Sequence, residues 1–296
     1  MPLAPKRSIL SGVRVNTAMR RQVVAGRLNS SLAACINQMV KHKVDAVLIL
    51  DDLNRPAGVL SKTDLISAYY TLLPVETPAG DLVARELVFC HADDLLEDAI
   101  DRMQTHGIHR IYVRSKSINE MIGTLSYLDV VGLLYKYCRK CPRSIFRQLQ
   151  ENTESVDRLR VRDVMSTALH TCRSDNNLSE VIETLTAYRC GAALIVDGAN
   201  RPAGVISKSD LVLAYKHGRP IPTPAGEIMQ HPVWSCAADS ILAKALQVML
   251  IRDIQQIFVY PEDPGNIVGV LSLSDSARFR SGSCRACIPG RMITDD

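Results

Sequence analysis

Four copies of a seven-residue motif place a serine and an aspartate three positions apart. Each copy reads Gly, two further residues, Ser, two further residues and Asp, and it follows a strand-like apolar run. The serine–aspartate pairs are Ser61 and Asp64, Ser126 and Asp129, Ser207 and Asp210, and Ser272 and Asp275. A carboxylate has two oxygens that can accept hydrogen bonds from a diol, and a hydroxyl can donate to a phosphate. The motif therefore suits a ligand that carries both groups.

Three of the four motifs carry a second hydroxyl, one residue before the aspartate. It belongs to Thr63, Ser209 or Ser274, whereas Leu128 takes this position in the second motif. The second site is therefore less well supported, and we expect at least one ligand in the second half of the chain, where both motifs are complete. The alternative for each aspartate is that it only caps the helix that follows, a role that suits Asp.

Two lysines lie inside the motifs, Lys62 in the first and Lys208 in the third. A phosphate needs nearby cations, and the positive end of a helix that starts after the motif also favours an anion. The alternative is that both lysines are solvated surface charges.

Two C-x-x-C pairs lie just beyond the last helix expected in each half, namely Cys138 with Cys141 and Cys284 with Cys287. Two such pairs could meet as a tetrahedral Cys₄ site for zinc or an iron–sulfur cluster. The alternatives are reduced thiols without a ligand and redox-active disulfides. We expect the other cysteines to be small buried hydrophobic residues. They are Cys35, Cys90, Cys172, Cys190 and Cys236.

The chain is an internal duplication with an offset of 146 residues. The segment Asn54–Val59 recurs with an identical sequence at Asn200–Val205, and Thr77–Gly80 recurs identically at Thr223–Gly226. The two C-x-x-C pairs obey the same offset. One register without a gap over so many positions is not explained by chance.

A helical pattern precedes each motif, with apolar residues at i, i+3, i+4 and i+7. Two short apolar runs separated by turn residues follow and predict a β-hairpin, and the chain after each aspartate is helical again. Each repeat of about 60 residues should thus fold as a βαββα unit that needs a neighbour to bury its core. The expected helix caps are Ser30 or Ser31, Asp93, Asn177 and Asp239.

Composition excludes several classes of protein. The 296 residues are 47% apolar, which allows a sizeable core. A formal net charge of +4 is too mild for a nucleic-acid surface. No apolar run reaches the roughly 18 residues that span a bilayer, and the N-terminus has no stretch suited to a secretory signal. We therefore expect a cytoplasmic protein with no nucleic-acid or membrane partner.

The motif that closes each βαββα unit, repeated in pairs, resembles the CBS-domain family from about Gly12 to Arg280. The resemblance implies an α/β fold of four βαββα CBS repeats that form two tandem Bateman modules in a pseudo-twofold disc. This plan is similar to that of the γ subunit of AMP-activated protein kinase. The implied repeats span 12–72, 80–141, 158–218 and 226–287, with a linker at 142–157.

Members of this family commonly bind AMP, ADP, ATP or another adenosyl ligand in clefts between paired repeats. The resemblance assigns the motif aspartates to the ribose diol and the motif hydroxyls to phosphate. His109 and Arg110 resemble phosphate-contacting residues of that γ subunit, whereas the duplicate positions hold Gln255 and Gln256. The first strand of each repeat would contact the adenine, and the expected segments are 22–25, 86–89, 168–171 and 232–235.

The resemblance implies a non-catalytic regulatory protein in signal transduction, with AMP or ATP as its ligand. No P-loop, HExxH or GxSxG motif occurs in the sequence. The output would pass to a separate effector protein or to a homo-oligomer. The alternative function is a metal- or redox-sensing scaffold built on the C-x-x-C pairs.

Overall fold

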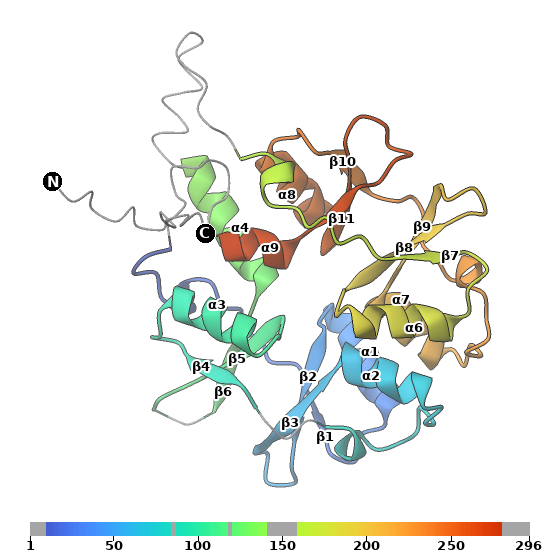
Figure 1. The fold of residues 1–296 in the computed structure, drawn as a ribbon. Coiled ribbons are helices and arrows are strands. Elements are labelled where there is room, and N and C mark those ends of the chain that lie inside the picture. The colour runs from blue at the N-terminus through green and yellow to red at the C-terminus, as the bar shows by residue number, and fades with distance from the viewer. Residues whose placement is uncertain (1–9, 84–86, 118–119, 141–158, 280–296) are drawn as a thin grey trace, which may run out of the picture. The chain divides into compact units, whose positions relative to one another are not determined.

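The computed structural model describes residues 10–83, 87–117, 120–140 and 159–279, which form four repeats with one order of elements (Figure 1). Each repeat opens with a 3-10 turn. Repeat 1 comprises η1 (Val15–Thr17), β1 (Ala25–Arg27), α1 (Leu32–His42), β2 (Ala46–Leu50), β3 (Pro56–Ser61) and α2 (Lys62–Tyr70). Repeat 2 comprises η2 (Ala79–Asp81), β4 (Phe89–His91), α3 (Leu96–Thr105), β5 (Arg110–Arg114), β6 (Met121–Ser126) and α4 (Tyr127–Lys140).

The second half of the chain follows the same plan. Repeat 3 comprises η3 (Val161–Asp163), β7 (Thr171–Arg173), α6 (Leu178–Ala187), β8 (Ala192–Val196), β9 (Pro202–Ser207) and α7 (Lys208–Lys216). Repeat 4 comprises η4 (Ala225–Glu227), β10 (Ser235–Ala237), α8 (Leu242–Arg252), β11 (Gln256–Tyr260), β12 (Gly269–Ser272) and α9 (Leu273–Phe279). The expected βαββα order is confirmed in all four repeats.

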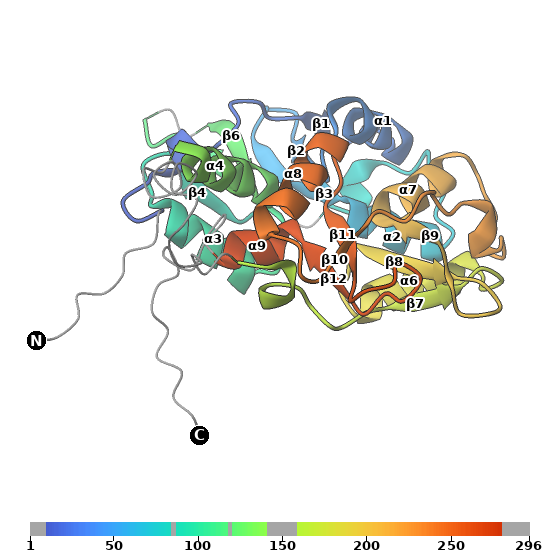
Figure 2. The same cartoon turned by 90° about the horizontal axis from the view of Figure 1, so that it is seen from above.

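Each repeat has its own three-stranded sheet, with the second strand in the centre. The first strand pairs with it in parallel and the third strand pairs with it antiparallel, as in β1–β2–β3. Helix α6 packs on the corresponding sheet of repeat 3, as Figure 2 shows. The first strands begin only at the last residue of each expected segment, because pairing starts there, with Ala25 opposite Leu48 in repeat 1. Their expected positions were therefore wrong by three residues.

Local sequence explains where the helices begin and which face they bury. Ser31 is the N-cap of α1 and accepts a hydrogen bond from the Ala34 N–H, and Lys43 ends the helix in a left-handed conformation. The apolar stripe of α1 is at most 2% exposed, and it consists of Leu32, Cys35, Ile36 and Met39. The spacing of apolar residues therefore identified the core face of this helix.

The expected caps hold for some helices and fail for others. Asn177 caps α6 as expected, with a capping box to its first turn. Asp93 and Asp239 do not cap α3 and α8, because these helices begin after Leu95 and Ile241, two residues further along the chain. A carboxylate that far ahead of the helix is not at the N-cap position, from which the first-turn N–H groups are reached.

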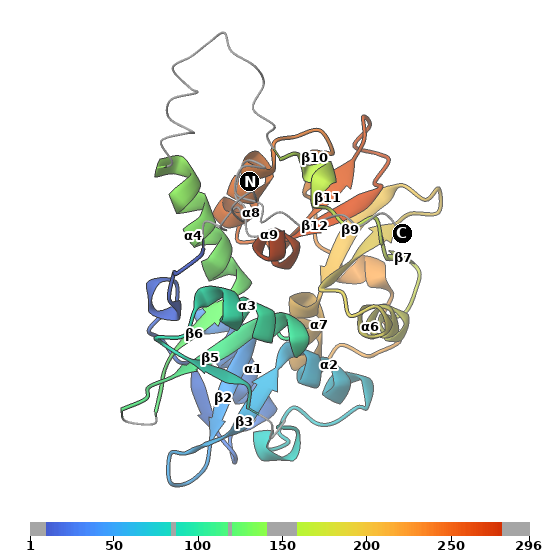
Figure 3. The same cartoon turned by 60° about the vertical axis from the view of Figure 1, so that its left-hand side comes forward.

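Contacts divide the chain into two compact units that cut across the order of the repeats. One unit holds the described residues between 22 and 88 and between 168 and 234, so it contains the strands and α-helices of repeats 1 and 3 together with η2 and η4. The other holds the described residues up to 21, between 89 and 167, and from 235 onward, so it contains the strands and α-helices of repeats 2 and 4 together with η1 and η3. In each unit the last helices of the two repeats are neighbours, α2 with α7 and α4 with α9 (Figures 1 and 3).

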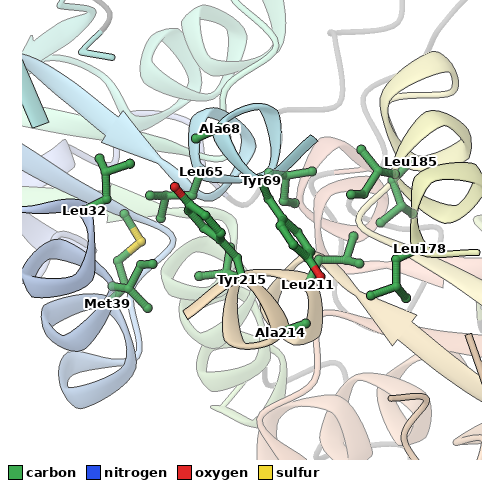
Figure 4. Packing of buried hydrophobic residues seen from close by; sticks show 14 of the residues in the cluster. Leu32, Met39, Leu65, Ala68, Tyr69, Leu178, Leu185, Leu211, Ala214 and Tyr215 are labelled. Atoms are coloured by element: carbon green, nitrogen blue, oxygen red, sulfur yellow. The ribbon is translucent and has the colours of Figure 1, made fainter. Parts of the chain in front are cut away.

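The unit of repeats 1 and 3 has a continuous core around α2 and α7. Leu65 and Leu211, at equivalent positions of the two helices, are fully buried. Tyr69 and Tyr215 lie side by side between these helices, with their hydroxyl ends pointing in opposite directions (Figure 4). The helix that follows each motif is therefore the surface through which two repeats meet.

The segment before β1 belongs to the unit of repeats 2 and 4. Arg20 and Thr124 exchange both backbone hydrogen bonds, at 2.8 and 2.9 Å. Gly123 makes this approach possible, because a Cβ at this position would lie 2.4 Å from the Arg20 carbonyl oxygen. Among the described residues, no helix combines the length and apolar character that crossing a bilayer requires.

Candidate functional site

Each motif forms a capping box at the start of the last helix of its repeat. In repeat 1, the backbone N–H and the hydroxyl of Ser61 both donate to Asp64 Oδ2 at 2.7 Å. In repeat 3, the same groups of Ser207 donate to Asp210 Oδ2 at 2.8 and 2.5 Å. The serine is thus the N-cap and the aspartate is the third helical residue. The alternative that the aspartate itself is the N-cap is wrong, although the aspartate does belong to the cap.

Repeats 2 and 4 have the same arrangement. The hydroxyls of Ser126 and Ser272 donate at 2.5 Å to Asp129 Oδ2 and Asp275 Oδ2. All four motifs therefore use one carboxylate oxygen for the helix start and turn the other away from it. A capping box is a local interaction, so the motif sequence alone is sufficient to build it.

The second carboxylate oxygen distinguishes the four repeats. In repeats 1, 3 and 4, Oδ1 of Asp64, Asp210 and Asp275 accepts no hydrogen bond from the part of the chain that the structure describes. In repeat 2, the Arg20 guanidinium lies 2.5 Å from Asp129 Oδ1. Both oxygens of Asp129 are therefore engaged, whereas the other three carboxylates keep an acceptor for a ligand.

An open pocket of about 470 Å³ adjoins Asp129 in the unit of repeats 2 and 4. The segment before β1, helix α4 and the end of α8 line it, with Thr17, Ala18, Arg20, Leu128, Asp129, Gly132, Leu133, Lys136, Leu250 and Asp253. Asp129 is only 6% exposed and Arg20 is 51% exposed, so the guanidinium covers the carboxylate on the solvent side. No motif pointed to this arginine, which lies 109 residues before Asp129 in the chain.

The motif lysines are not solvated surface charges, so that alternative is wrong. Lys62 is 19% exposed and forms an ion pair of 2.6 Å with Asp45. It also donates to the hydroxyl of Ser209 at 2.8 Å, while Lys208 donates to the hydroxyl of Thr63 at 3.0 Å. Burial lowers the pKa of Lys208 below its usual value, and the charge of Lys62 acts in the same direction.

His109 and Arg110 lie at the start of β5, on the sheet that carries the second motif. The Arg110 guanidinium donates to Thr124 Oγ1 at 3.0 Å. The His109 ring meets the Tyr127 ring edge to face, with centroids 5.7 Å apart. The guanidinium of Arg278, from α9, lies 5.7 Å from the same Tyr127 ring. Three basic residues therefore surround the start of α4.

Several buried polar atoms of this region have no partner among the described residues. They are Nε of Arg110 and Arg114, the hydroxyls of Tyr112 and Tyr127, and Oε1 of Gln256. Burial raises the pKa of the Tyr112 hydroxyl, so it stays protonated and can donate. Gln256 occupies the position in repeat 4 that Arg110 has in repeat 2, so the two repeats offer different groups at this place.

The C-x-x-C pairs lie outside the residues whose side chains the structure describes. In the described part of the chain, no cluster of three or more His, Cys, Asp or Glu residues is arranged to hold a metal ion. Cys35, Cys90 and Cys172 are buried, which confirms their assignment to the interior, whereas Cys190 and Cys236 are only half-buried.

Comparison with known proteins gives consistent matches. A family model for the CBS domain matches residues 14–71, 79–136, 161–217 and 225–275. The uncharacterized protein MJ1225 of Methanocaldococcus jannaschii is 20% identical over 210 residues, which are 70% of this chain and 72% of that protein. The crystal structure of MJ1225, for which homology to γ-AMPK has been suggested, has a TM-score of 0.74 at 15% identity, over 90% of this chain and 99% of that chain.

A second solved structure shares the fold, and a third matches part of the chain. An uncharacterized conserved protein from Pyrococcus horikoshii has a TM-score of 0.59 at 16% identity and covers 90% of this chain and 100% of its own. The CBS-domain protein PAE2072 from Pyrobaculum aerophilum, solved with AMP, has a TM-score of 0.38 at 22% identity, over 46% of this chain and 98% of its own. Since each matched segment of the family model coincides with one βαββα repeat, and together they cover most of the sequence, this chain belongs to the CBS-domain family and carries four CBS domains in two tandem Bateman pairs.

Proposed function

We propose that this protein is a non-catalytic regulator that binds adenine nucleotides, or another adenosyl ligand, through its CBS motifs. The observation that carries this proposal is the second carboxylate oxygen of Asp64, Asp210 and Asp275, which the capping box leaves without a partner among the described residues. An ionised carboxylate oxygen beside a helix start is a strong acceptor for a ribose hydroxyl. The rest of the carboxylate is already held in place by the serine, so little ordering is needed on binding.

The hydroxyls and cations near these aspartates suit the phosphate end of the ligand. In the proposal, the hydroxyls of Thr63, Ser209 and Ser274 donate to phosphate, and His109 and Arg110 add basic groups in repeat 2. The hydroxyls of Ser61, Ser126, Ser207 and Ser272 already donate to the motif aspartates, so in the proposal they hold the carboxylates that bind the ribose. Repeat 2 is the weakest of the four sites, because Arg20 already engages Asp129 and a ribose would have to displace it.

Regulation by this protein requires a second molecule. We propose that ligand binding changes its interaction with a separate effector protein or with further copies of the chain, in the cytoplasm. Family membership supports a regulatory role, because four CBS repeats cover most of the sequence. The proposal assigns the protein no reaction of its own.

Calorimetric titration with AMP, ATP, NADH and S-adenosylmethionine tests the proposal. Changing Asp210 or Asp275 to Asn keeps one acceptor oxygen for the cap but replaces the free oxygen with an N–H donor, so binding should weaken by about 1–3 kcal/mol. The same change at Asp129 should have little effect and serves as the matched control. If Asp210→Asn and Asp275→Asn bind all four ligands as the unaltered protein does, the carboxylates serve only the helix starts.

A further inference from the structure

In repeats 1 and 3, the lysine of each motif donates a hydrogen bond to a hydroxyl of the other motif, across the contact between α2 and α7. Lys62 donates to Ser209 at 2.8 Å, and Lys208 donates to Thr63 at 3.0 Å. Each lysine is the first residue of one helix, and each hydroxyl belongs to the second residue of the other. The two bonds are therefore equivalent under the duplication, and each repeat supplies a cation to the hydroxyl of its neighbour.

The charges in this lysine–hydroxyl cluster are unevenly compensated. Lys62 has a carboxylate partner in Asp45, at 2.6 Å. In repeat 3 the position equivalent to Asp45 is Gly191, and Lys208 forms no ion pair with any residue that the structure describes. Among the described residues the two ammonium groups thus have one ion-pair partner between them, and the Asp45 and Asp64 carboxylates act on Lys208 without forming an ion pair with it. In a half-buried place a charge attracts a counter-ion more strongly than it does in bulk water.

The Thr63 and Ser209 hydroxyls can each donate a hydrogen bond to an anion while still accepting one from a lysine. A hydroxyl that accepts a hydrogen bond through a lone pair still has its own proton to donate. A phosphate oxygen beside Thr63 could accept from that hydroxyl and from the Lys208 ammonium together. A phosphate beside Ser209 would meet Lys62 in the same way. Charge-assisted donors of this kind form the stronger hydrogen bonds to phosphate.

We propose that Lys208 completes the phosphate subsite of repeat 1 and that Lys62 completes the phosphate subsite of repeat 3. Each subsite then takes its cation from the other half of the chain, and its ligand group is a phosphomonoester or a phosphoanhydride. The nucleotide part of this inference rests on the proposed function. That each repeat supplies a lysine to the motif of the other rests on the two hydrogen bonds and on the missing carboxylate at Gly191.

Paired titrations with AMP and adenosine test the inference, because only AMP carries the phosphate. Asp275→Asn in the background weakens the site of repeat 4, and repeat 2 is already the weakest site because Arg20 engages Asp129, so the measurement reports mainly on repeats 1 and 3. Lys208→Met and Lys62→Met should each weaken AMP binding about tenfold or more at one of these two sites, and the double variant should do so at both, while adenosine binding stays within about twofold, as the loss of a charged hydrogen bond predicts. Arg55→Met and Arg201→Met remove one cation each from exposed hairpin positions with the same offset, and they should leave both ligands unaffected.

A double-mutant cycle identifies which lysine serves which hydroxyl. Thr63→Val and Lys208→Met should be strongly non-additive for AMP, whereas Thr63→Val and Lys62→Met should add. Thermal melts establish that each variant folds, and Lys208→Arg, which keeps the charge, should retain at least half of the AMP effect if Lys208→Met does not fold. If Lys62→Met and Lys208→Met bind AMP as tightly as the control variants Arg55→Met and Arg201→Met do, the inference is overturned and the proposed function stays intact.

Titration with pyrophosphate separates the two proposals. If the unaltered protein binds no nucleotide, but pyrophosphate raises its melting temperature and fails to do so in the double variant Lys62→Met, Lys208→Met, the proposed function is wrong and the phosphate subsites stand. If neither nucleotides nor pyrophosphate bind, both proposals are wrong.

Discussion

Tyr69 and Tyr215, which are equivalent residues of repeats 1 and 3, stack on each other with ring centroids 5.2 Å apart and an angle of 25° between the rings. The Tyr69 hydroxyl donates to the Arg219 carbonyl at 2.6 Å, and the Tyr215 hydroxyl donates to the Leu73 carbonyl at 2.7 Å. Each tyrosine therefore satisfies a backbone acceptor in the opposite repeat. The pair connects the two repeats by packing and by hydrogen bonds at the same place.

Removing one of these hydroxyls should destabilise the unit by a measurable amount. Tyr69→Phe and Tyr215→Phe should each lower the free energy of unfolding by about 1 kcal/mol, because each leaves a carbonyl without its donor. Tyr69→Ala should cost about 3–5 kcal/mol, since it also leaves a cavity. Urea unfolding measures these changes. Tyr188→Phe is the control, because Tyr188 is 62% exposed and should change stability by less than about 0.5 kcal/mol.

The same tyrosines should make the protein sensitive to alkali. Burial raises the pKa of Tyr69 to about 12 and also raises the pKa of Tyr215. The pKa of such a tyrosine is higher in the folded state than in the unfolded chain, where it is about 10. Its contribution to stability is therefore complete below a pH of about 10 and is lost as the pH rises through the pKa of the folded state. Urea midpoints from pH 8 to pH 12 should therefore fall. The urea midpoint of the double variant Tyr69→Phe, Tyr215→Phe should fall less steeply with pH. An equal slope in the two proteins would show that these tyrosines do not cause the sensitivity to alkali.

The glycine of the second motif should not tolerate a side chain. Gly123→Ala should destabilise the protein by about 1–3 kcal/mol, because a Cβ there would lie 2.4 Å from the Arg20 carbonyl oxygen and would push the two backbones apart. Gly132→Ala, in the interior of α4, meets no atom within 4 Å and should instead gain up to about 1 kcal/mol from better helix propensity. Chemical denaturation of both variants gives the comparison, and similar losses in the two would refute this explanation.

The interior cysteines should be unreactive while the protein is folded. Burial raises the pKa of Cys90 to about 12 and the pKa of Cys35 and Cys236 to about 11. The thiolate is the reactive form, so at pH 8 about one molecule in a thousand or fewer carries it at these positions. Alkylation with iodoacetamide followed by peptide mapping should find these three residues unmodified in the folded protein and modified in guanidinium. Rapid labelling of Cys90 without denaturant would show that its burial is not maintained.

The sequence alone was enough to identify the repeats, the order of elements and the motifs. These features depend on local patterns: an apolar stripe predicts the buried face of α1, turn residues predict the hairpins, and Ser-x-x-Asp builds a capping box from neighbouring residues. Local patterns do not decide where a helix or a strand begins when neighbouring residues suit the first position equally well. They placed caps at Asp93 and Asp239, although the helices start after Leu95 and Ile241, and they started the first strands three residues early.

Only the tertiary structure decided which repeats share a compact unit and which side chains meet at the motifs. Helix α2 buries Leu65, Ile66, Ala68 and Tyr69, so its sequence marks a covered helix without naming what covers it. The helix that covers it is α7, 146 residues further along, and this contact brings Lys62 to Ser209 and Lys208 to Thr63. The same holds for Arg20 at Asp129. Such contacts depend on the packing of segments that are distant in the chain, and no local pattern of residue types records which distant partner buries a given face.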